Sequence, residues 1–157
     1  MSSNTSNVYQ VDPVCIEEYK NFKLRRKHKW VCFSIIEDAS QQKIHTVKSV
    51  ESDKSKDVSD LIHSLSEHEC CYVVYEHEYT TKDGRKTDKL FFITWNPRAA
   101  ATSLQMDYLT GRSAIRDICD GCFDLSATSG SDIKTGVLGN DADDSDEDDN
   151  GDDWMDN

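Results

Sequence analysis

The segment KLFFITW, residues 89–95, constrains the fold more than any other stretch of the chain. Five of its seven residues are apolar, and they occupy both alternating sides of an extended strand. Strands of this kind are buried on both faces of a sheet, and helices usually provide the cover. The segment therefore predicts an interior strand with helices packed on both sides of the sheet.

The rest of the chain supplies the other elements of such a fold. Further strands are predicted at 30–36, 43–50, 71–81 and, more weakly, 123–128, where aromatic and β-branched residues gather. Asp83-Gly84 predicts a tight turn between two of them. Helices are predicted at 13–26, after an Asp12-Pro13 start, and at 58–65, whereas 51–57 reads as a loop and 129–140 is ambiguous. The order predicts one α/β domain, with a mixed central β-sheet sandwiched between α-helices.

A long helix is predicted from about Arg98 to Cys119, with Asn96 as its cap, Pro97 in its first turn and a bend at Gly111. At 100° per residue, its core face comprises Ala101, Leu104, Tyr108, Gly111, Ile115 and Ile118. The opposite face comprises Thr102, Gln105, Met106, Leu109, Ser113 and Arg116. Exposed Met and Leu among small polar residues are typical of a surface that another protein covers, but the chain's own tail or loops are an equal alternative.

The net charge of −12 is concentrated at the end of the chain. Residues 141–157 contain ten of the 30 acidic residues and none of the 18 Lys and Arg, which leaves a net charge of −2 for residues 1–140. Like charges repel one another, so 141–157 is predicted to be a disordered acidic tail, for solubility or, more rarely, for docking a basic partner. Residues 1–10, rich in Ser and Asn, are predicted to be a flexible arm, and 11–140 the folded domain.

The composition argues against several classes of protein. No run of about 18 apolar residues is present to span a membrane, and MSSNTSNVYQV lacks the basic and apolar blocks of a signal peptide. The six cysteines lie within apolar patterns, which favours reduced thiols in a cytosolic or nuclear protein. No phosphate-binding loop or nucleophile motif is present, so neither an enzyme nor a cofactor is predicted.

One cysteine motif has a second interpretation. Cys119-Asp-Gly-Cys122 is a CxxC, which in isolation could be a redox pair or half of a zinc site. No second CxxC exists, and strand alternation should point Cys70 and Cys71 to opposite faces of the sheet. The histidines also lack metal-site spacing, so buried thiols are the favoured interpretation and no metal is predicted.

Residues 69–97, ECCYVVYEHEYTTKDGRKTDKLFFITWNP, resemble the central part of the ADF/cofilin family of actin-depolymerising proteins. That family shows a D-C-R-Y-A-V-Y-D-F-E-Y stretch, a short basic hairpin and then K-L-F-F-I-x-W-x-P. The resemblance extends over about 6–133 and includes TSNVYQV, FKLRRKHKW and a long helix with Met106, Tyr108 and Ala114. It implies a single ADF-homology domain that binds actin monomers and filament sides, prefers ADP-actin and speeds disassembly without covalent catalysis. It also implies a monomeric cytoplasmic protein of the cytoskeleton, with the nucleus as a second location and no nucleic-acid partner.

The resemblance also implies which residues contact actin. The arm and the front of the long helix would enter a cleft of the actin monomer, through Ser6, Asn7, Val8, Tyr9, Thr102, Ser103, Gln105, Met106, Arg112 and Arg116. Lys86 and Lys89 match basic positions of the hairpin that touches a second actin in a filament. Ser6 matches the family's regulatory serine, where a phosphate would add about −1.5 to −2 charges and oppose binding. The hairpin lysines and the run LRRKHK, residues 24–29, are candidates for phosphoinositide contact.

Several positions depart from the family pattern. Ser103 and Gln105 stand where two cations are common, and Asp117 and Thr87 replace other basic residues. The family's C-terminal helix corresponds to GVLGNDADDSDEDD, whose glycines and acidic run predict no helix. These departures predict weakened filament-side binding and severing, with monomer binding retained. Two alternatives are an ADF-fold module that engages a non-actin partner through its acidic tail, and a CxxC thiol redox protein.

Overall fold

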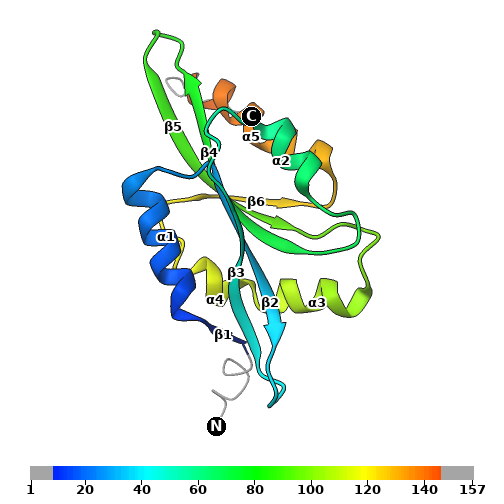
Figure 1. Cartoon of the computed structure of the whole chain (residues 1–157). Helices are drawn as coiled ribbons and strands as arrows, with labels where there is room; N and C mark the ends of the chain where they lie inside the picture. The colour runs from blue at the N-terminus through cyan, green and yellow to red at the C-terminus, as the bar shows by residue number, and fades with distance from the viewer. Residues whose placement is uncertain (1–8, 146–157) are drawn as a thin grey trace, which may run out of the picture.

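Six strands form one mixed sheet within residues 9–145, the part of the chain that the computed structural model describes (Figure 1). They are β1 (Tyr9–Val11), β2 (Trp30–Glu37), β3 (Lys43–Glu51), β4 (Cys71–Thr80), β5 (Lys86–Trp95) and β6 (Phe123–Ala127). Their order across the sheet is β1-β3-β2-β4-β5-β6. The two outer pairs are parallel and the inner pairs are antiparallel, so the predicted mixed sheet is confirmed.

Helices cover both faces of this sheet (Figure 1). They are α1 (Pro13–Arg25), α2 (Val58–Ser64), α3 (Thr102–Thr110), α4 (Arg112–Arg116) and α5 (Gly130–Ser145). Residues of α1, α3 and α4 pack into one core cluster, and residues of α2 and α5 pack into the other. The predicted helix-sheet-helix layering is therefore confirmed.

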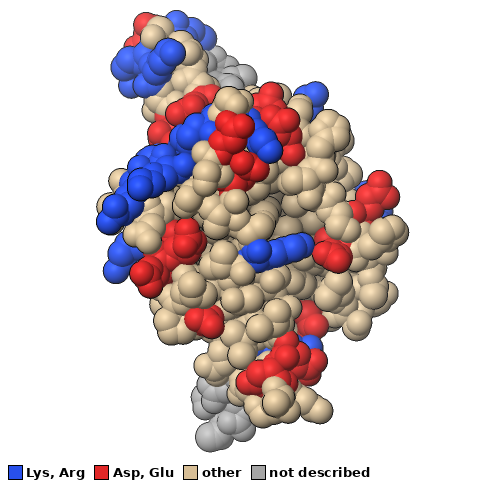
Figure 2. Space-filling model, viewed as in Figure 1, with Lys and Arg blue, Asp and Glu red and all other residues tan. Residues whose placement is uncertain are grey.

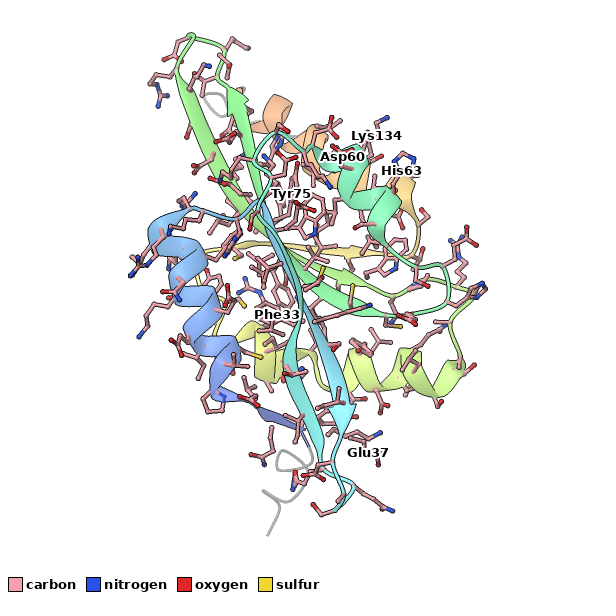
Figure 3. The ribbon with its side chains drawn as sticks, viewed as in Figure 1. Phe33, Glu37, Asp60, His63, Tyr75 and Lys134 are labelled. Carbon is pink, nitrogen blue, oxygen red and sulfur yellow. The ribbon has the colours of Figure 1, made fainter. Side chains whose placement is uncertain are left out.

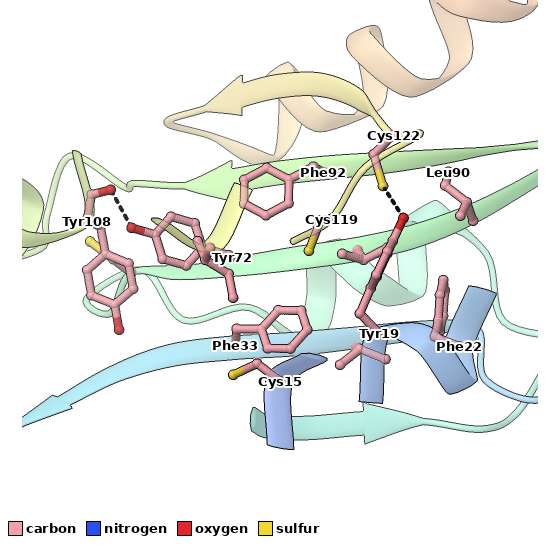
Figure 4. Close-up of a cluster of buried hydrophobic side chains, with 14 of the residues drawn as sticks. Cys15, Tyr19, Phe22, Phe33, Tyr72, Leu90, Phe92, Tyr108, Cys119 and Cys122 are labelled. Atoms are coloured by element: carbon pink, nitrogen blue, oxygen red, sulfur yellow. Dashed lines mark hydrogen bonds between the residues drawn. The ribbon is translucent and has the colours of Figure 1, made fainter. Parts of the chain in front are cut away.

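Side-chain alternation in the strands explains why the chain has two cores. In β5, Leu90 and Phe92 enter the cluster beneath α1, whereas Phe91 and Ile93 enter the cluster beneath α2 and α5. Cys70 and Cys71 likewise point to opposite faces, as predicted. Figure 4 shows the first cluster, in which Tyr72 and Phe92 stack with ring centroids 5.6 Å apart. Figure 3 shows Phe33 and Tyr75 in the interior, on opposite sides of the sheet, and Glu37, Asp60, His63 and Lys134 at the periphery.

The N-terminal arm is shorter than predicted. Tyr9 and Gln10 are not part of a flexible segment, because they pair in parallel with Lys43 and Ile44 of β3. Asp12 then caps α1 as predicted, since its side chain accepts a hydrogen bond from the Val14 amide. Residues 1–8 lie outside the described part of the chain.

The long helix is also different from its prediction. Asn96 and Pro97 do not start it: residues 97–100 form a turn, closed by a 3.1 Å hydrogen bond from the Ala100 amide to the Pro97 carbonyl. The helix begins at Thr102 and is interrupted at Gly111, where a bend was expected. It ends at Arg116 and not at Cys119. The interruption coincides with close packing, because a Cβ at Gly111 would lie 2.6 Å from the Tyr9 ring.

The prediction that the C-terminal segment cannot form a helix is wrong. Residues 130–145 form α5, which includes the first five residues of the predicted disordered tail. Ile133 and Val137 are fully buried and anchor α5 on the sheet. A Cβ at Gly136 would lie 2.3 Å from a Leu125 methyl carbon, so glycine permits α5 to lie directly against β6. Tertiary packing thus outweighs the weak intrinsic helix propensity of the segment. Residues 146–157 lie outside the described part of the chain.

Candidate functional site

The start of the described chain is fastened to the front of α3. The Tyr9 hydroxyl donates a 3.1 Å hydrogen bond to one carboxylate oxygen of Asp107, and the Lys43 ammonium lies 3.1 Å from the other. The Tyr9 ring fills the space left by the missing side chain of Gly111, and its centroid lies 6.3 Å from that of His45. β1, β3 and α3 therefore meet at one point.

The charges at this junction are balanced. Burial and the neighbouring Asp107 carboxylate raise the pKa of Tyr9, so the phenol remains neutral at physiological pH. The hydrogen bond to Asp107 raises the pKa of Lys43, which keeps the ammonium charged. Asp107 and Lys43 were not among the sequence-predicted site residues. Their pairing joins residues 64 positions apart, and no local pattern reveals it.

The outward face of α3 carries an exposed apolar pair. Met106 is 55% exposed and Leu109 is 57% exposed, as the helical periodicity predicted. Thr102 and Ser103, at the first turn of the helix, are also exposed. Ala101, at the cap position of α3, provides no side-chain hydrogen bond, so the first amides of the helix lack a side-chain cap. This end of α3 offers apolar contact together with a partial positive charge.

Gln105 has a different position from its neighbours. Its amide nitrogen lies 3.3 Å from the Pro97 carbonyl oxygen, 3.2 Å from that of Arg98 and 2.9 Å from that of Ala100. The side chain therefore turns back and holds the loop before α3. Gln105 is half-buried, so its side chain holds the loop before α3 in place and does not project into solvent.

Arg112 and Arg116 are held by their own fold. Arg112 donates from Nε to the Thr94 hydroxyl at 3.2 Å and also bonds the Asp124 carboxylate. Arg116 donates to the carbonyl oxygens of Cys119 at 2.7 Å and Cys122 at 2.9 Å. Both guanidinium groups lie over the Phe92 ring, at 5.7 and 5.6 Å. These two arginines tie α4 to β5, β6 and the 119–122 loop.

The β4–β5 hairpin carries the second group of predicted contact residues. Lys86 is exposed at the start of β5, and the Lys89 ammonium lies 5.2 Å from the Tyr79 ring centroid and 5.0 Å from that of Phe123. Gly84 has φ +90°, which fits the predicted turn at the tip. Figure 2 shows Lys and Arg gathered at this tip and along the α1 side of the molecule.

A buried carboxylate fixes the base of the hairpin. Glu76 is 2% exposed, and its two oxygens bond Arg26, at 2.9 Å, and Lys54. Arg26 also reaches Asp88 on β5 at 3.0 Å. Glu76 was not among the sequence-predicted site residues: CYVVYEHEY holds two acids, Glu76 and Glu78, and the sequence does not tell which of them is buried. Arg26 and Lys29, a buried lysine, belong to the run LRRKHK, so only part of that run faces solvent.

The CxxC motif lies in the first core cluster (Figure 4). Cys119 and Cys122 are buried, and the Tyr19 hydroxyl lies 3.4 Å from the Cys122 sulfur. Burial raises the pKa of both thiols, which opposes the thiolate that a redox pair requires. Within residues 9–145, no three His, Cys, Asp or Glu side chains gather as a metal site would require. None of the helices in the same range has the length and apolar character to cross a membrane.

Comparison with known proteins agrees with this architecture. Residues 8–142 match the family model of cofilin/tropomyosin-type actin-binding proteins. Actin-depolymerizing factor 9 of Arabidopsis thaliana is 31% identical over 129 residues, which cover 82% of this chain and 88% of that protein. Among solved structures, the chain is similar to Streptomyces griseoflavus cofilin, with a TM-score of 0.71 and 24% identity over 85% of this chain and 96% of that one.

A second solved structure, Plasmodium berghei actin depolymerization factor 2, has a TM-score of 0.70 at 19% identity and covers 83% of this chain and 96% of its own. At these identities the solved structures establish the shared fold, whereas the family match and the Arabidopsis relative establish the lineage. Members of this family regulate actin without being enzymes. The chain belongs to the ADF/cofilin family and is an actin-binding protein of that type.

Proposed function

We propose that the protein binds actin monomers through the surface formed by Tyr9 and α3 and thereby promotes filament depolymerisation and turnover. Its binding to filament sides and its severing are weaker than its monomer binding. It acts as a monomer on the cytoplasmic actin cytoskeleton. The observation that carries this proposal is the junction of Tyr9, Asp107 and Lys43, which joins β1 to the second half of α3, the helix that exposes Met106 and Leu109.

The monomer-binding part is supported by the character of that surface. Met106 and Leu109 provide exposed apolar area, and Thr102 and Ser103 are small enough for close approach. Asp107 is neutralised by Lys43, so it does not add an unpaired negative charge. Ser6, Asn7 and Val8, assigned to the same surface from the resemblance, lie outside the described residues.

The weaker filament binding is supported by charge. Ser103 and Gln105 lack the two cations common in the family, and Gln105 is turned toward its own loop. Arg112 and Arg116 are engaged by internal hydrogen bonds, so a partner would compete for them. The C-terminal helix gives no support, because α5 is present where its loss was predicted. Support specific to the filament contact comes from the hairpin, where Thr87 replaces a basic residue, since the front of α3 belongs to the proposed monomer surface.

Two actin assays test the two parts separately. Titration of fluorescently labelled actin monomers should show saturable binding, while co-sedimentation with filaments should leave most of the protein in the supernatant at concentrations that saturate monomers. Pelleting at near-equal stoichiometry with filaments would overturn the monomer preference. Absence of binding in the monomer titration would overturn the monomer-binding part and favour a partner other than actin. Tail-truncated protein, ending at residue 145, serves in both assays to isolate the contribution of the acidic segment.

A further inference from the structure

Two buried thiols on one face of the sheet border a cavity of about 340 Å³. Cys32 of β2 and Cys71 of β4 line it, together with Lys48 and Ser49 of β3 and Glu69 at its mouth. A water molecule takes up about 30 Å³ in the liquid, so molecules of that size fit inside. Ser64–Ser66, at the end of α2, also line the cavity, and its two cysteines belong to the core cluster on the face of the sheet opposite to α3.

Strand register brings the two cysteines together. Cys32 lies opposite Val73 in the β2–β4 ladder, and Cys71 is two residues from Val73 on the same face. Both side chains belong to the core cluster covered by α2 and α5, and they are 5% and 2% exposed. They are therefore diagonal neighbours across adjacent strands.

A bulge in β3 adds a positive charge to this pair. Cys32 pairs with Ser49, but the next residue of β2, Phe33, pairs with Val47, so Lys48 is an extra residue in β3. Bulges redirect side chains, and here Lys48 lines the cavity. Its ammonium lies 3.2 Å from a carboxylate oxygen of Glu69, where both side chains are partly exposed.

These neighbours shift the pKa values of the two thiols in opposite directions. A hydrogen bond from the Cys71 thiol lowers the pKa of Cys32, with further help from the Ser49 hydroxyl and the Lys48 charge, although burial opposes them. The pKa of Cys71 is raised in turn, by the same hydrogen bond and by burial. Elsewhere burial dominates and raises the pKa of Cys15 to about 12 and that of Cys70 to about 11. Thiolate character is thus concentrated at Cys32.

We propose that Cys32 is a modification site for small electrophiles, hydrogen peroxide in particular, with Cys71, Ser49 and Lys48 stabilising its thiolate. The thiolate sulfur attacks one peroxide oxygen and the O–O bond breaks. The attacked oxygen stays on sulfur as S–OH, and the other leaves as hydroxide, which combines with the proton that the Cys32 thiol released on ionising to give water. Sulfur loses two electrons and peroxide gains two, which yields the sulfenic acid of Cys32. The Lys48 ammonium stabilises the departing hydroxide. This chemistry is independent of the proposed actin binding.

Strand geometry favours a sulfenic acid at Cys32 over a disulfide between Cys32 and Cys71. Diagonal residues on antiparallel strands have Cα atoms about 7–8 Å apart, whereas disulfides usually span about 4.4–6.8 Å. Cys71 therefore serves as the hydrogen-bond donor to Cys32, and closure to a disulfide would require the strands to move.

The test is a competition among the six cysteines of the reduced full-length protein. After brief exposure to hydrogen peroxide, remaining thiols are alkylated and each site is quantified by mass spectrometry, with dimedone in a parallel sample to trap sulfenic acid. Cys32 should lose its thiol at least about tenfold faster than Cys15 or Cys70, since one pKa unit changes the thiolate fraction about tenfold. Dimedone should label Cys32. Equal rates at the three sites would overturn the proposal.

Surface variants isolate the contribution of Lys48. Lys48→Gln should slow oxidation of Cys32 by about threefold or more, Lys48→Arg should restore the rate, and Glu69→Gln should increase it, because it removes the competing anion. Cys15 serves as the internal reference in each variant. Both side chains are partly exposed, so the fold tolerates these changes. An unchanged Cys32 rate in Lys48→Gln would contradict the proposed site.

Discussion

Tyr9 shows how one residue links segments that are distant in the chain. Its hydroxyl bonds Asp107, 98 positions away, and its ring occupies the place of a Gly111 side chain. Gly111 has φ −84° and ψ 1°, a conformation open to any residue, so the need for glycine comes from the contact and not from the backbone.

A double-mutant cycle measures this contact. Gly111→Ala should lower the free energy of unfolding by about 1 to 3 kcal/mol, because its Cβ would lie 2.6 Å from the Tyr9 ring. In a Tyr9→Ala background the same change should have a much smaller effect, since the ring is gone. Urea denaturation of the four proteins checks this. Equal effects in both backgrounds would mean that the ring does not occupy this place.

His45 lies beneath the same junction and is fully buried. Neither ring nitrogen makes a hydrogen bond of normal geometry within the described residues. Burial lowers the pKa of His45 to about 4, and a weak interaction with the Gly111 backbone offsets this only in part. In the unfolded chain the group titrates near 6.5, so between these values the unfolded state binds more protons.

The resulting pH dependence has a defined sign. The stabilising contribution of neutral His45 is complete above pH 6.5 and is lost as the pH falls toward 4. Between pH 7.5 and 5 the loss should be about 2 kcal/mol. Replacing the histidine by His45→Leu should remove that part of the dependence, whereas His63→Gln, at an exposed position of α2, should leave it intact. Denaturant titrations of the unchanged protein and the two variants at several pH values test this. If the free energy of unfolding falls equally with pH in all three proteins, the assignment to His45 is wrong.

At the scale of elements, α5 forms in spite of three glycines, Gly130 at its start and Gly136 and Gly139 in its interior. Gly136 lies against Leu125 of β6, whereas no atom lies within 4 Å of a Cβ built at Gly139. The two positions therefore separate packing from intrinsic helix propensity.

Alanine at these positions should have opposite effects. Gly139→Ala should stabilise the protein by about 0.5–1 kcal/mol, because alanine loses less conformational entropy in a helix. Gly136→Ala should destabilise it by about 1 to 3 kcal/mol, since its Cβ would lie 2.3 Å from a Leu125 methyl carbon. Thermal unfolding compares the pair directly. Stabilisation by both changes would show that α5 does not pack tightly on β6.

At the scale of the whole molecule, the sheet separates the two proposed sites. The face with α1, α3 and α4 presents the candidate actin-binding surface, and the face with α2 and α5 covers the thiol cavity. Because α5 includes Asp141, Asp143 and Asp144, the described residues 9–145 hold 23 of the 30 acidic residues and all 18 Lys and Arg, which gives them a net charge of −5. We therefore expect the binding of a partner to the folded part to depend on a few individual charges.

One added cation should therefore have a measurable effect. Ser103→Lys, at the exposed front of α3, should tighten actin binding by about two- to tenfold at low salt and less at high salt. Ser131→Lys, at an exposed position of α5 on the other face, changes the net charge equally and should have little effect. Monomer titration at two salt concentrations distinguishes them. Equal tightening by both variants would indicate nonspecific attraction.

The sequence alone determined five of the six strands, the helices that precede β6 and their layering, because strand alternation and helical periodicity are local patterns; it did not predict β1 or α5. KLFFITW required cover on both faces, and Met106 and Leu109 were placed outside by periodicity. The family was also evident at this level, because the motifs that carry the resemblance are continuous within residues 69–97.

The tertiary structure decided what depends on contacts between distant residues. α5 forms because Gly136 meets Leu125, Tyr9 joins the sheet because β3 and Gly111 receive it, and Gln105 turns inward because three carbonyl groups face it. The proximity of Cys32 and Cys71 depends on the register of β2 and β4, and the position of Lys48 depends on the bulge in β3. Such contacts follow from the fold as a whole, since neither propensity nor spacing along the chain records which residues become neighbours.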